Sequence, residues 1–451
     1  MIKRSPGSDV TGAPRTTSIA DPPPRPTRGA PAFSTDDLQP VAGKGILDRR
    51  LFLRRGLLLG TALSTGIASA GPNDMRPAWM REPGQPFTPY GHPSPFEKQL
   101  IRRISANRSA PGNGIAMTPL EELEGIITPN GLHFERHHNG VPQIDPAQHR
   151  LMIHGMVKQP LTFRMADLAR YPMTSCMIFI ECGGNSNAGW HQAPMQKPAG
   201  SVHGLVSCAE WTGVPLAILL DQAGIDPKVS WVIAEGGDSV AMHVSLPLEK
   251  MLDDCIVALY QNGEPIRPEN GYPARLVVPG WEGVLHVKWL RRLQLTDRPA
   301  MARNETGKYT ELMPGGTARQ FTFVMEAKSL ITSPSYGQIL PGPEVYEIKG
   351  LAWSGRGRIR KVEVTADGGQ SWAEAALSDP VLPRCFTRFR AAWKWDGSPS
   401  VLKSRATDET GYVQPEREVL VAERGRSGYF HYNGIVAWAV AADGEVSHVY
   451  R

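Results

Sequence analysis

Short apolar runs alternate with glycine and proline turns from Gly131 to Leu295. Runs of this length, bounded by turn residues, predict β-strands that bury at least one face. The clearest are RLMIHGMV, SCMIFIE, SWVIAEG, CIVALYQNGEPI and ARLVVPG. In the fourth run the Asn262-Gly263 pair predicts a tight hairpin turn, because both residues tolerate a positive φ.

Two segments between these runs space their apolar residues as a helix does, namely MADLARYP and TGVPLAILLDQAGID. The second is predicted to end at Gly224, because glycine readily adopts the left-handed conformation that terminates helices. Short helices mixed with strands predict an α+β domain.

The pattern changes to strands alone from Phe321 onward. In RIRKVEVTADGGQSWAEAAL, the residues Asp367-Gly368-Gly369 predict a turn, and Trp372 is expected on the returning strand. RFRAAWKWDG and GIVAWAVAADGEVSHVY continue the same theme. Several short strands within about 130 residues predict an immunoglobulin-like β-sandwich.

The first 70 residues predict no packed domain. Residues 21–31, DPPPRPTRGAP, are too rich in proline and arginine to pack and predict disorder. Next, Arg49 and Arg50 precede an apolar stretch that ends at Ala68-Ser69-Ala70, which has the form of a signal-peptidase site. This is typical of the twin-arginine signal, which exports folded proteins to the periplasm. A membrane anchor would need an apolar run of about 20 residues, longer than this one.

The predicted organisation has four parts. They are a disordered extension with the export signal (1–70), an irregular segment (71–115), an α+β domain (116–300) and a β-sandwich (320–451).

The net charge of +5 belongs to the N-terminal extension. Residues 1–70 hold ten Lys and Arg against five Asp and Glu, which leaves 39 of each sign (49 − 10 and 44 − 5) on the rest of the chain. The remainder is therefore neutral, which gives no electrostatic case for binding nucleic acid.

Five cysteines occur without any CxxC or CxxCH spacing: Cys176, Cys182, Cys208, Cys255 and Cys385. That spacing argues against a zinc ribbon, a thioredoxin-type pair and a covalent c-type haem. Cys182 stands out because the apolar run in FIECGGNSNAGW delivers it into a loop of small residues. It could be an inert buried thiol or a nucleophile partnered by His191. It could also be a thiolate ligand to a soft, high-valent metal, since small neighbours leave room for a bulky cofactor.

Five blocks of the chain carry a resemblance to a known family. They are FERHHNGVP (134–142), ECGGNS (181–186), AEWTGVPL (209–216), QNGEPI with GYPARLVVPGWEGVLHVKWLRRLQL (261–295) and VEVTADGGQSW (362–372). In this order they resemble the sulfite oxidase family of mononuclear molybdenum enzymes, over residues 115–450. The resemblance implies an α+β fold with a sulfite-oxidase-type molybdopterin domain, followed by an immunoglobulin-like dimerisation domain.

The resemblance also implies a set of site residues. Cys182 would be the molybdenum ligand, the only one from the protein, beside one pterin dithiolene and two oxo groups. Arg136 and Tyr309 would lie in the active site near the oxo groups. Four further residues would bind the molybdopterin: His138, Lys197, Arg275 and Lys288.

The residue types suit these roles. A buried phosphate needs charge-assisted donors, and arginine offers a planar fork where lysine offers a point charge. Most arginines and lysines are solvated surface charges, but the apolar blocks around Arg275 and Lys288 favour burial with a partner. The two adjacent histidines of RHHN are poorly spaced for one metal ion, which favours hydrogen bonding to the pterin or to the protein.

The chain departs from the family at three positions. Sulfite oxidases commonly read CAGNRR and line a small oxyanion pocket with arginine, whereas Ser186 and Asn187 stand here. Asn270 stands before GYP, where the family commonly has histidine. The changes reduce positive charge and predict an enzyme that is not tuned for free sulfite. ECGGNSNAGW and QKPAG resemble instead the SoxC-type molybdenum subunits of the periplasmic sulfane dehydrogenases of thiosulfate oxidation.

That subfamily implies a substrate held by a sulfur-carrier protein, the sulfane sulfur of a thiocysteine, which is oxidised to a sulfonate. Electrons would pass to a separate c-type cytochrome subunit, because the chain has no CxxCH. The implied assembly is a heterotetramer built on a homodimer of sandwich domains. There are three alternatives. The first is a sulfite:cytochrome c oxidoreductase, and the second is a cofactor-free structural partner. The third is a related methionine-sulfoxide reductase, although that group lacks the sandwich.

Overall fold

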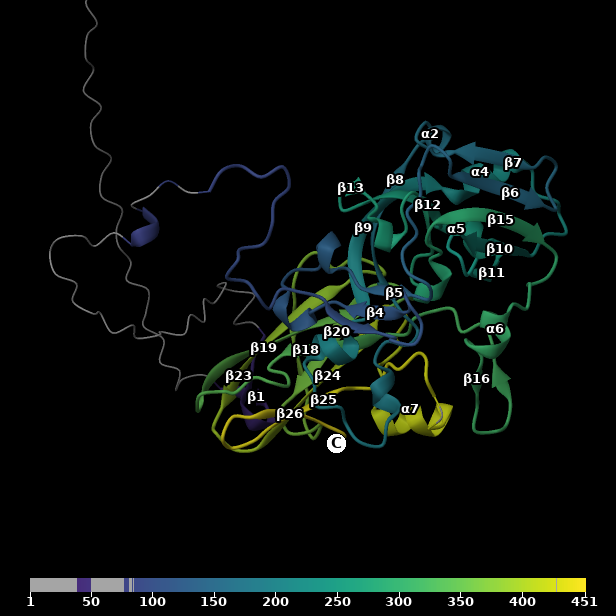
Figure 1. Cartoon of the computed structure of the whole chain (residues 1–451). Coiled ribbons are helices and arrows are strands. Elements are labelled where there is room, and N and C mark those ends of the chain that lie inside the picture. The colour runs from purple at the N-terminus through teal and green to yellow at the C-terminus, as the bar shows by residue number, and fades with distance from the viewer. Residues whose placement is uncertain (1–38, 50–76, 81–82, 84, 427) are drawn as a thin grey trace, which may run out of the picture. The chain divides into compact units, whose positions relative to one another are not determined.

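The structure is a computed structural model that describes residues 39–49, 77–80, 83, 85–426 and 428–451. Figure 1 shows an α+β domain and a β-sandwich within the compact unit Gln39–Arg451. The predicted disordered residues before 39 and the predicted leader from Arg50 to Ala70 lie outside the described residues. Among the residues that the structure describes, no helix has the length and apolar character needed to cross a membrane.

Two five-stranded sheets build the α+β domain. The first has the order β11-β10-β15-β6-β7, in which only β15 and β6 run parallel. Its strands are β6 (Arg150–Gly155), β7 (Leu161–Arg164), β10 (Trp231–Gly236), β11 (His243–Pro247) and β15 (Leu290–Thr296). The second is antiparallel, with the order β13-β12-β9-β8 and with β14 also on β12. Its strands are β8 (Thr174–Glu181), β9 (Val206–Pro215), β12 (Ile256–Gln261), β13 (Glu264–Pro265) and β14 (Arg275–Val277).

The predicted hairpin and helices are present in this domain. Asn262 and Gly263, with φ of 47° and 81°, join β12 to β13. The two predicted helices are α2 (Met165–Leu168) and α4 (Leu216–Ala223), and α4 ends at Gly224 with a φ of 72°. Its remaining helices are α3 (Ala199–His203), α5 (Leu248–Asp253) and α6 (Arg303–Gly307).

A small antiparallel sheet of β3 (Arg103–Ala106), β4 (Gly114–Met117) and β5 (Glu135–His137) accompanies the domain. We predicted an irregular segment over residues 71–115, and the structure departs from this because β3 pairs with β4 along its whole length. Pairing of β5 with β4 also fixes the backbone of the RHH motif.

Two antiparallel sheets face each other in the sandwich, which confirms the predicted immunoglobulin-like architecture. The first consists of β1 (Pro40–Ala42), β2 (Ile46–Leu47), β18 (Lys328–Ser333), β19 (Glu344–Trp353), β22 (Ala376–Leu377) and β23 (Thr387–Trp395). The second consists of β20 (Ile359–Thr365), β21 (Ala373–Glu374), β24 (Ser400–Asp408), β25 (Ala437–Val440) and β26 (Val446–Val449). A hairpin of β16 (Glu311–Leu312) and β17 (Ala318–Arg319) precedes the sandwich, and α7 (Arg417–Arg424) interrupts it.

Part of the segment predicted to be disordered belongs to the sandwich. Ile46 and Leu47 are buried, and Ile46 pairs with Trp393 on the edge of β23. A short apolar pair that fills an open sheet edge gains enough burial to order, although its surroundings in the sequence are polar.

The turn predicted at Asp367-Gly368-Gly369 is present, but Trp372 lies immediately before the returning strand β21 and not on it. Its indole N–H donates to the carbonyl of Gly369 at 3.1 Å, so this side chain closes the turn. The hydrogen bond to the turn therefore takes the place of strand pairing at this position.

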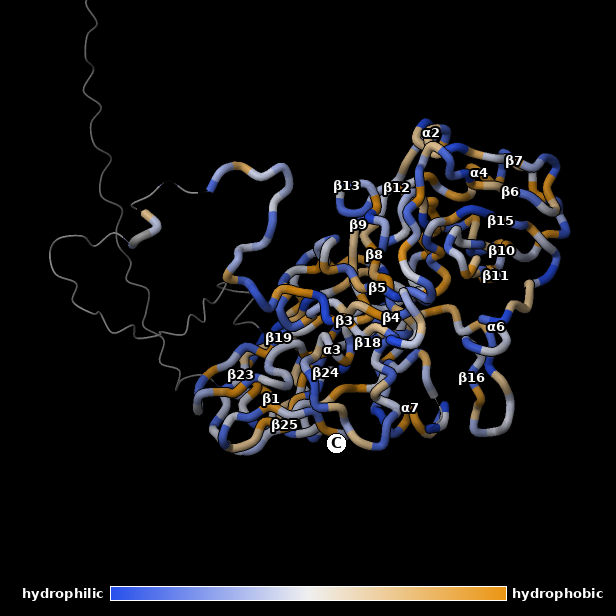
Figure 2. The backbone as a smooth tube through the Cα atoms, viewed as in Figure 1, coloured by the Kyte–Doolittle hydropathy of each residue, from blue (hydrophilic) through white to orange (hydrophobic). Residues whose placement is uncertain are grey.

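The two domains share a hydrophobic core. Phe179 of β8 and Cys208 of β9 belong to the same buried cluster as Trp353 and Phe386 of the sandwich. The rings of Phe179 and Trp353 lie 6.3 Å apart, and the Sγ atoms of Cys208 and Cys385 lie 3.3 Å apart. Figure 2 shows apolar segments along the strands of both domains. An interface of this kind resembles the interior of one domain more than a contact between mobile ones.

This shared core predicts the effect of Phe179→Ala. The ring is fully buried, so its removal should lower the free energy of unfolding by about 3–5 kcal/mol. Both domains should still unfold in one transition, seen alike by far-UV circular dichroism and tryptophan fluorescence in urea. Met177→Ala on the same strand is the control, because Met177 is 36% exposed. Equal losses for the two variants, or separate transitions for the two probes, would contradict the shared core.

Candidate active site

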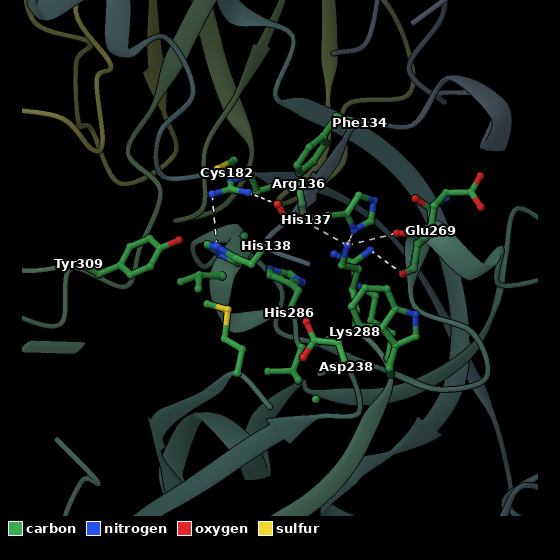
Figure 3. A pocket seen from close by; sticks show the side chains of 18 residues that line it. Phe134, Arg136, His137, His138, Cys182, Asp238, Glu269, His286, Lys288 and Tyr309 are labelled. Atoms are coloured by element: carbon green, nitrogen blue, oxygen red, sulfur yellow. Dashed lines mark hydrogen bonds between the residues drawn. The ribbon is translucent and has the colours of Figure 1, made fainter. Parts of the chain in front are cut away.

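One cavity in the α+β domain gathers most of the residues that the sequence singled out (Figure 3). The predicted site residues that line it are Arg136, His138, Cys182, Arg275, Lys288 and Tyr309. They come from separate segments: Arg136 lies within β5, Cys182 follows β8, and Tyr309 follows α6. Lys197 does not line the cavity and is exposed, so the structure does not bring this predicted cofactor residue to the site.

The loop after β8 holds Cys182 at the cavity wall. The Cys182 N–H donates to Leu205 at 2.9 Å, and its carbonyl accepts from the N–H of Asn185 at 2.8 Å. Gly183 has no room for a side chain, because a Cβ there would lie 1.7 Å from Oε1 of Glu282. The glycine that follows Cys182 is therefore required by close packing against Glu282.

The Cys182 thiol is protonated unless something displaces its proton. Burial raises the pKa of Cys182 to about 11, a hydrogen bond with the Gly184 backbone opposes this rise, and the charge of Glu282 adds to it. A metal ion that binds the sulfur would have to expel that proton. His191, considered as a partner for a nucleophilic cysteine, is exposed and does not line the cavity.

The buried Arg275 and the partly buried Lys288 also line the cavity. Arg275 is 5% exposed, donates to the carbonyl of Asn270 at 2.9 Å and lies 5.0 Å from the Trp211 ring centre. Its Nε has no hydrogen-bond partner. Nζ of Lys288 donates to the carbonyls of Arg136 and Glu269 at 3.1 and 3.2 Å. Within the described residues, no carboxylate lies at ion-pair distance from Arg275 or Lys288.

Burial without a counter-charge makes both cations unfavourable. Desolvation lowers the pKa of Arg275 to about 9, and it lowers the pKa of Lys288 well below its usual value, with the charge of Arg275 adding to the effect. An anion with several acceptor oxygens would relieve this cost and would satisfy the unpartnered Nε. These residues therefore fit the phosphate of a pterin cofactor.

Tyr309, His138 and Arg136 surround the side of the cavity near Cys182 (Figure 3). Burial raises the pKa of Tyr309 well above its usual value, and a thiolate at Cys182 would raise it further. Desolvation and the nearby Arg136 lower the pKa of His138 to about 4. Tyr309 and His138 are thus neutral near pH 7, and the guanidinium of Arg136 is the positive charge closest to them in this wall.

Several cavity residues were not predicted from the sequence. Nδ1 of His137 lies 2.8 Å from Nζ of Lys288, and the Trp289 ring centre lies 4.5 Å from the same Nζ. Arg136 and His138, on either side of His137, were predicted as site residues, and so was Lys288, which precedes Trp289. Proximity in the sequence could therefore have indicated His137 and Trp289. Asp238 also lines the cavity, and it lies in a loop with no motif.

The C-terminal domain contacts Tyr309 and the cysteine loop through residues that no local sequence pattern indicates. The Phe430 ring stacks on Tyr309 with centres 4.7 Å apart, and the N–H of His431 donates to the carbonyl of Gly183 at 2.8 Å. A Cβ at Gly184 would lie 3.4 Å from Tyr429, which is 56% exposed. Residues 428–431 thus reach the cysteine loop from the sandwich, a contact that depends on tertiary structure alone.

The positions that depart from the family pattern occupy different surroundings. Asn270 lines the cavity and donates from Nδ2 to Gln261 at 3.0 Å. Ser186 and Asn187 do not line it. Ser186 is buried, takes a left-handed φ of 62° and lies against Lys328 and His203, at 2.6 and 2.7 Å from its hydroxyl. The serine therefore points into the protein interior.

The cavity combines a cysteine at the end of β8 with two cations that lack carboxylate partners among the described residues, and a β-sandwich follows this domain. These features are those of a molybdopterin-binding oxidoreductase. The family model described as an oxidoreductase molybdopterin binding domain matches residues 138–304. The model described as a Mo-co oxidoreductase dimerisation domain matches residues 319–436.

Known proteins agree with this class. A chain in the crystal structure of the sulfane dehydrogenase SoxCD from Paracoccus pantotrophus superposes with a TM-score of 0.81 and 45% sequence identity, over 84% of this chain and 99% of that one. Mouse mitochondrial sulfite oxidase is 33% identical over 67% of this chain and 58% of its own. Tomato NADH nitrate reductase is 30% identical over 66% of this chain and 37% of its own. The chain thus spans little more than half of the mouse relative, and it belongs to the sulfite oxidase family of molybdenum oxidoreductases.

Buried histidines around the cavity predict a pH-dependent stability of the cofactor-free protein. Desolvation and the charge of Arg275 lower the pKa of His133 and of His286 to about 3, from a usual 6.5. The folded state therefore resists protonation at these rings. The stability they permit is complete above pH 6.5 and should fall by about 1.4 kcal/mol per histidine for each pH unit below that value.

Urea unfolding between pH 6.5 and 5 would measure this loss, in a range where most carboxylates stay ionised. His286→Gln should remove part of the slope, whereas replacement of the exposed His92 by Gln should leave it unchanged. A stability that stays constant over this range would contradict the prediction.

Proposed function

We propose that this protein is the molybdenum subunit of a periplasmic sulfane dehydrogenase. It would bind the cofactor with one pterin through Cys182 and would oxidise the sulfane sulfur of a carrier-bound thiocysteine to a sulfonate. The observation that carries the proposal is the 45% identity to a sulfane dehydrogenase chain over 99% of that chain.

The cofactor supplies, when bound, oxygen-atom transfer and two-electron redox chemistry. Arg275 and Lys288 would hold its phosphate with charge-assisted hydrogen bonds in a buried setting. Cys182 would ligate the metal once its proton is displaced. Lys197 is exposed and does not line the cavity, so its predicted contact with the cofactor stays a prediction.

The sulfur of the substrate would meet Arg136 and Tyr309. Oxidation of a sulfane to a sulfonate adds three oxygen atoms and builds up negative charge on them. The guanidinium of Arg136 would stabilise that charge, and the hydroxyl of Tyr309 would donate a hydrogen bond, because its raised pKa keeps it protonated. The neutral His138 lies 3.3 Å from Nη2 of Arg136 and would orient the guanidinium.

The proposal extends to partners and location. Electrons would leave to a separate c-type cytochrome subunit, and the sandwich would pair two molybdenum subunits into a homodimer within a heterotetramer. The match of residues 319–436 to a dimerisation domain supports the pairing. The twin-arginine pattern before Ala70 supports export of the folded protein to the periplasm.

A sulfite:cytochrome c oxidoreductase is the second candidate. The 33% identity to mouse sulfite oxidase favours it, as does Arg136, which would attract a free anion to the cavity. Both candidates use the same cofactor, so only the substrate separates them.

Replacement of the proposed metal ligand gives a direct test. Cys182→Ser should abolish turnover and the thiolate-to-molybdenum absorption, because a hydroxyl is a harder and far more basic donor than a thiolate. The fold should persist, as judged by circular dichroism. Cys176→Ser is the matched control, because Cys176 is also partly buried, has a pKa raised to about 11 by burial, and lies outside the cavity. Full activity in Cys182→Ser would show that the metal is bound elsewhere.

Single-turnover reduction separates the two substrates. Oxidised, molybdenum-loaded protein is mixed with sulfite or with a carrier-bound persulfide, and bleaching of the thiolate-to-molybdenum band is followed. No cytochrome is needed, so a missing electron acceptor cannot affect the result. We expect bleaching by the persulfide and little by sulfite. Rapid bleaching at micromolar sulfite would identify a sulfite dehydrogenase instead.

A further inference from the structure

A buried ion pair links the sandwich to the residue that precedes Cys182. Nζ of Lys328, in β18, lies 3.0 Å from Oε1 of Glu181, the last residue of β8. The side chains are 1% and 2% exposed. The same Nζ donates to the hydroxyl of Ser186 at 2.6 Å. One lysine of the C-terminal domain therefore contacts the cysteine loop at both of its ends.

Other hydrogen bonds complete the contact. The indole N–H of Trp353, also from the sandwich, donates to the second oxygen of Glu181 at 2.7 Å. Nδ2 of Asn185 donates to Oε1 of Glu181 at 2.9 Å. Oδ1 of Asn185 accepts from the N–H of Leu205 at 3.0 Å. The carboxylate of Glu181 is thus fully engaged, and two of its partners belong to the other domain.

Two consecutive glycines weaken the internal restraint of the loop, although the Asn185 N–H donates to the Cys182 carbonyl at 2.8 Å. Gly183 and Gly184 follow the cysteine, and Ser186 occupies a left-handed conformation that side chains rarely adopt. Such a loop holds one shape only where its surroundings determine it. A buried ion pair is a poor source of net stability, because desolvation of the charges offsets their attraction, but it fixes geometry in a way that apolar contacts do not.

We propose that Lys328 is a positioning residue through which the sandwich domain fixes Cys182 at the cavity. This inference rests on the proposed role of Cys182 as the metal ligand. Loss of the ammonium would remove one partner from Glu181 and one from Ser186 at the same time, and the glycines between them would let the sulfur shift. The sandwich then acts on the chemistry of each subunit, in addition to any part in pairing subunits.

Lys403 provides a matched control for Lys328. It is 4% exposed, lies on β24 of the same sandwich and has its Nζ 3.2 Å from Oε2 of Glu416. Its ion pair has no contact with the cysteine loop. Lys328→Met and Lys403→Met therefore both remove a buried ammonium from one domain, and only the first removes it from the loop.

The test uses full-length, molybdenum-loaded protein. We expect Lys328→Met to retain the folded far-UV spectrum, to shift the thiolate-to-molybdenum absorption band and to alter the Mo(V) electron paramagnetic resonance signal. The value of kcat per bound molybdenum should fall by about 10–100-fold, with a much smaller change in KM, because a small misplacement at a reacting centre is costly. Lys403→Met should match the wild type in each measurement.

A second readout needs no cofactor. In the apoprotein, alkylation of Cys182 by iodoacetamide, followed by peptide mass spectrometry, should be faster in Lys328→Met than in the wild type or in Lys403→Met. A wild-type band, resonance signal and alkylation rate in Lys328→Met would overturn the proposal, even if the variant were less stable. That result would leave a structural role only.

The double variant Glu181→Gln/Lys328→Met is a control for the case in which Lys328→Met alone does not fold. Removing one partner leaves the other charge buried and unpaired, whereas removing both avoids that penalty. The double variant should recover stability but keep the altered band and the fast alkylation, and a wild-type band there would equally overturn the proposal. Failure of the proposed function would look different, since wild-type protein would then hold no molybdenum or Cys182→Ser would keep its activity.

Discussion

The packing of β8 and β9 against the sandwich is the interaction on which the site depends. Phe179 enters a core that belongs to both domains, so the strand that delivers the cysteine is held from two sides. The end of β8 is fixed by the ion pair of Glu181 with Lys328, and the next residue by the hydrogen bond from the Cys182 N–H to Leu205. A site built from a strand end needs such support, because the loop beyond it contains two consecutive glycines.

The distribution of charge separates the cavity into two regions. Arg275 is buried and Lys288 partly buried, neither has a carboxylate partner in the described chain, and desolvation lowers the pKa of both. The region near Cys182 is different, since Glu181 and Lys328 form an ion pair behind the loop, and Arg136 brings positive charge to the lining that includes Tyr309. One region is suited to hold an anion permanently, and the other is suited to stabilise charge that appears during a reaction.

The sequence predicted correctly those turns and helix ends that depend on the conformation of one or two residues. Asn262-Gly263 and Gly224 were identified because turns and helix ends require their φ values, and Cys182 because an apolar run ends in small residues. Arg275 and Lys288 were found through blocks shared with a family. Lys197 does not line the cavity, and it lies in an irregular segment before α3 whose path no local pattern determines. The orientation of Ser186 and the reach of Phe430 depend on contacts between distant segments, which no window of sequence contains.

The strand β2 covers part of the edge of β23, and cleavage of the predicted leader would remove that cover. Ile46 and Leu47 fill the edge of β23 beside Trp393, and they precede the predicted cleavage point after Ala70. If the leader is removed there, this strand leaves with it. The precursor would then carry a protected sheet edge, and the mature protein an open one with unpaired backbone groups. Such a cleavage would change the surface of the sandwich, because the edge of β23 beside Trp393 would lose its partner strand.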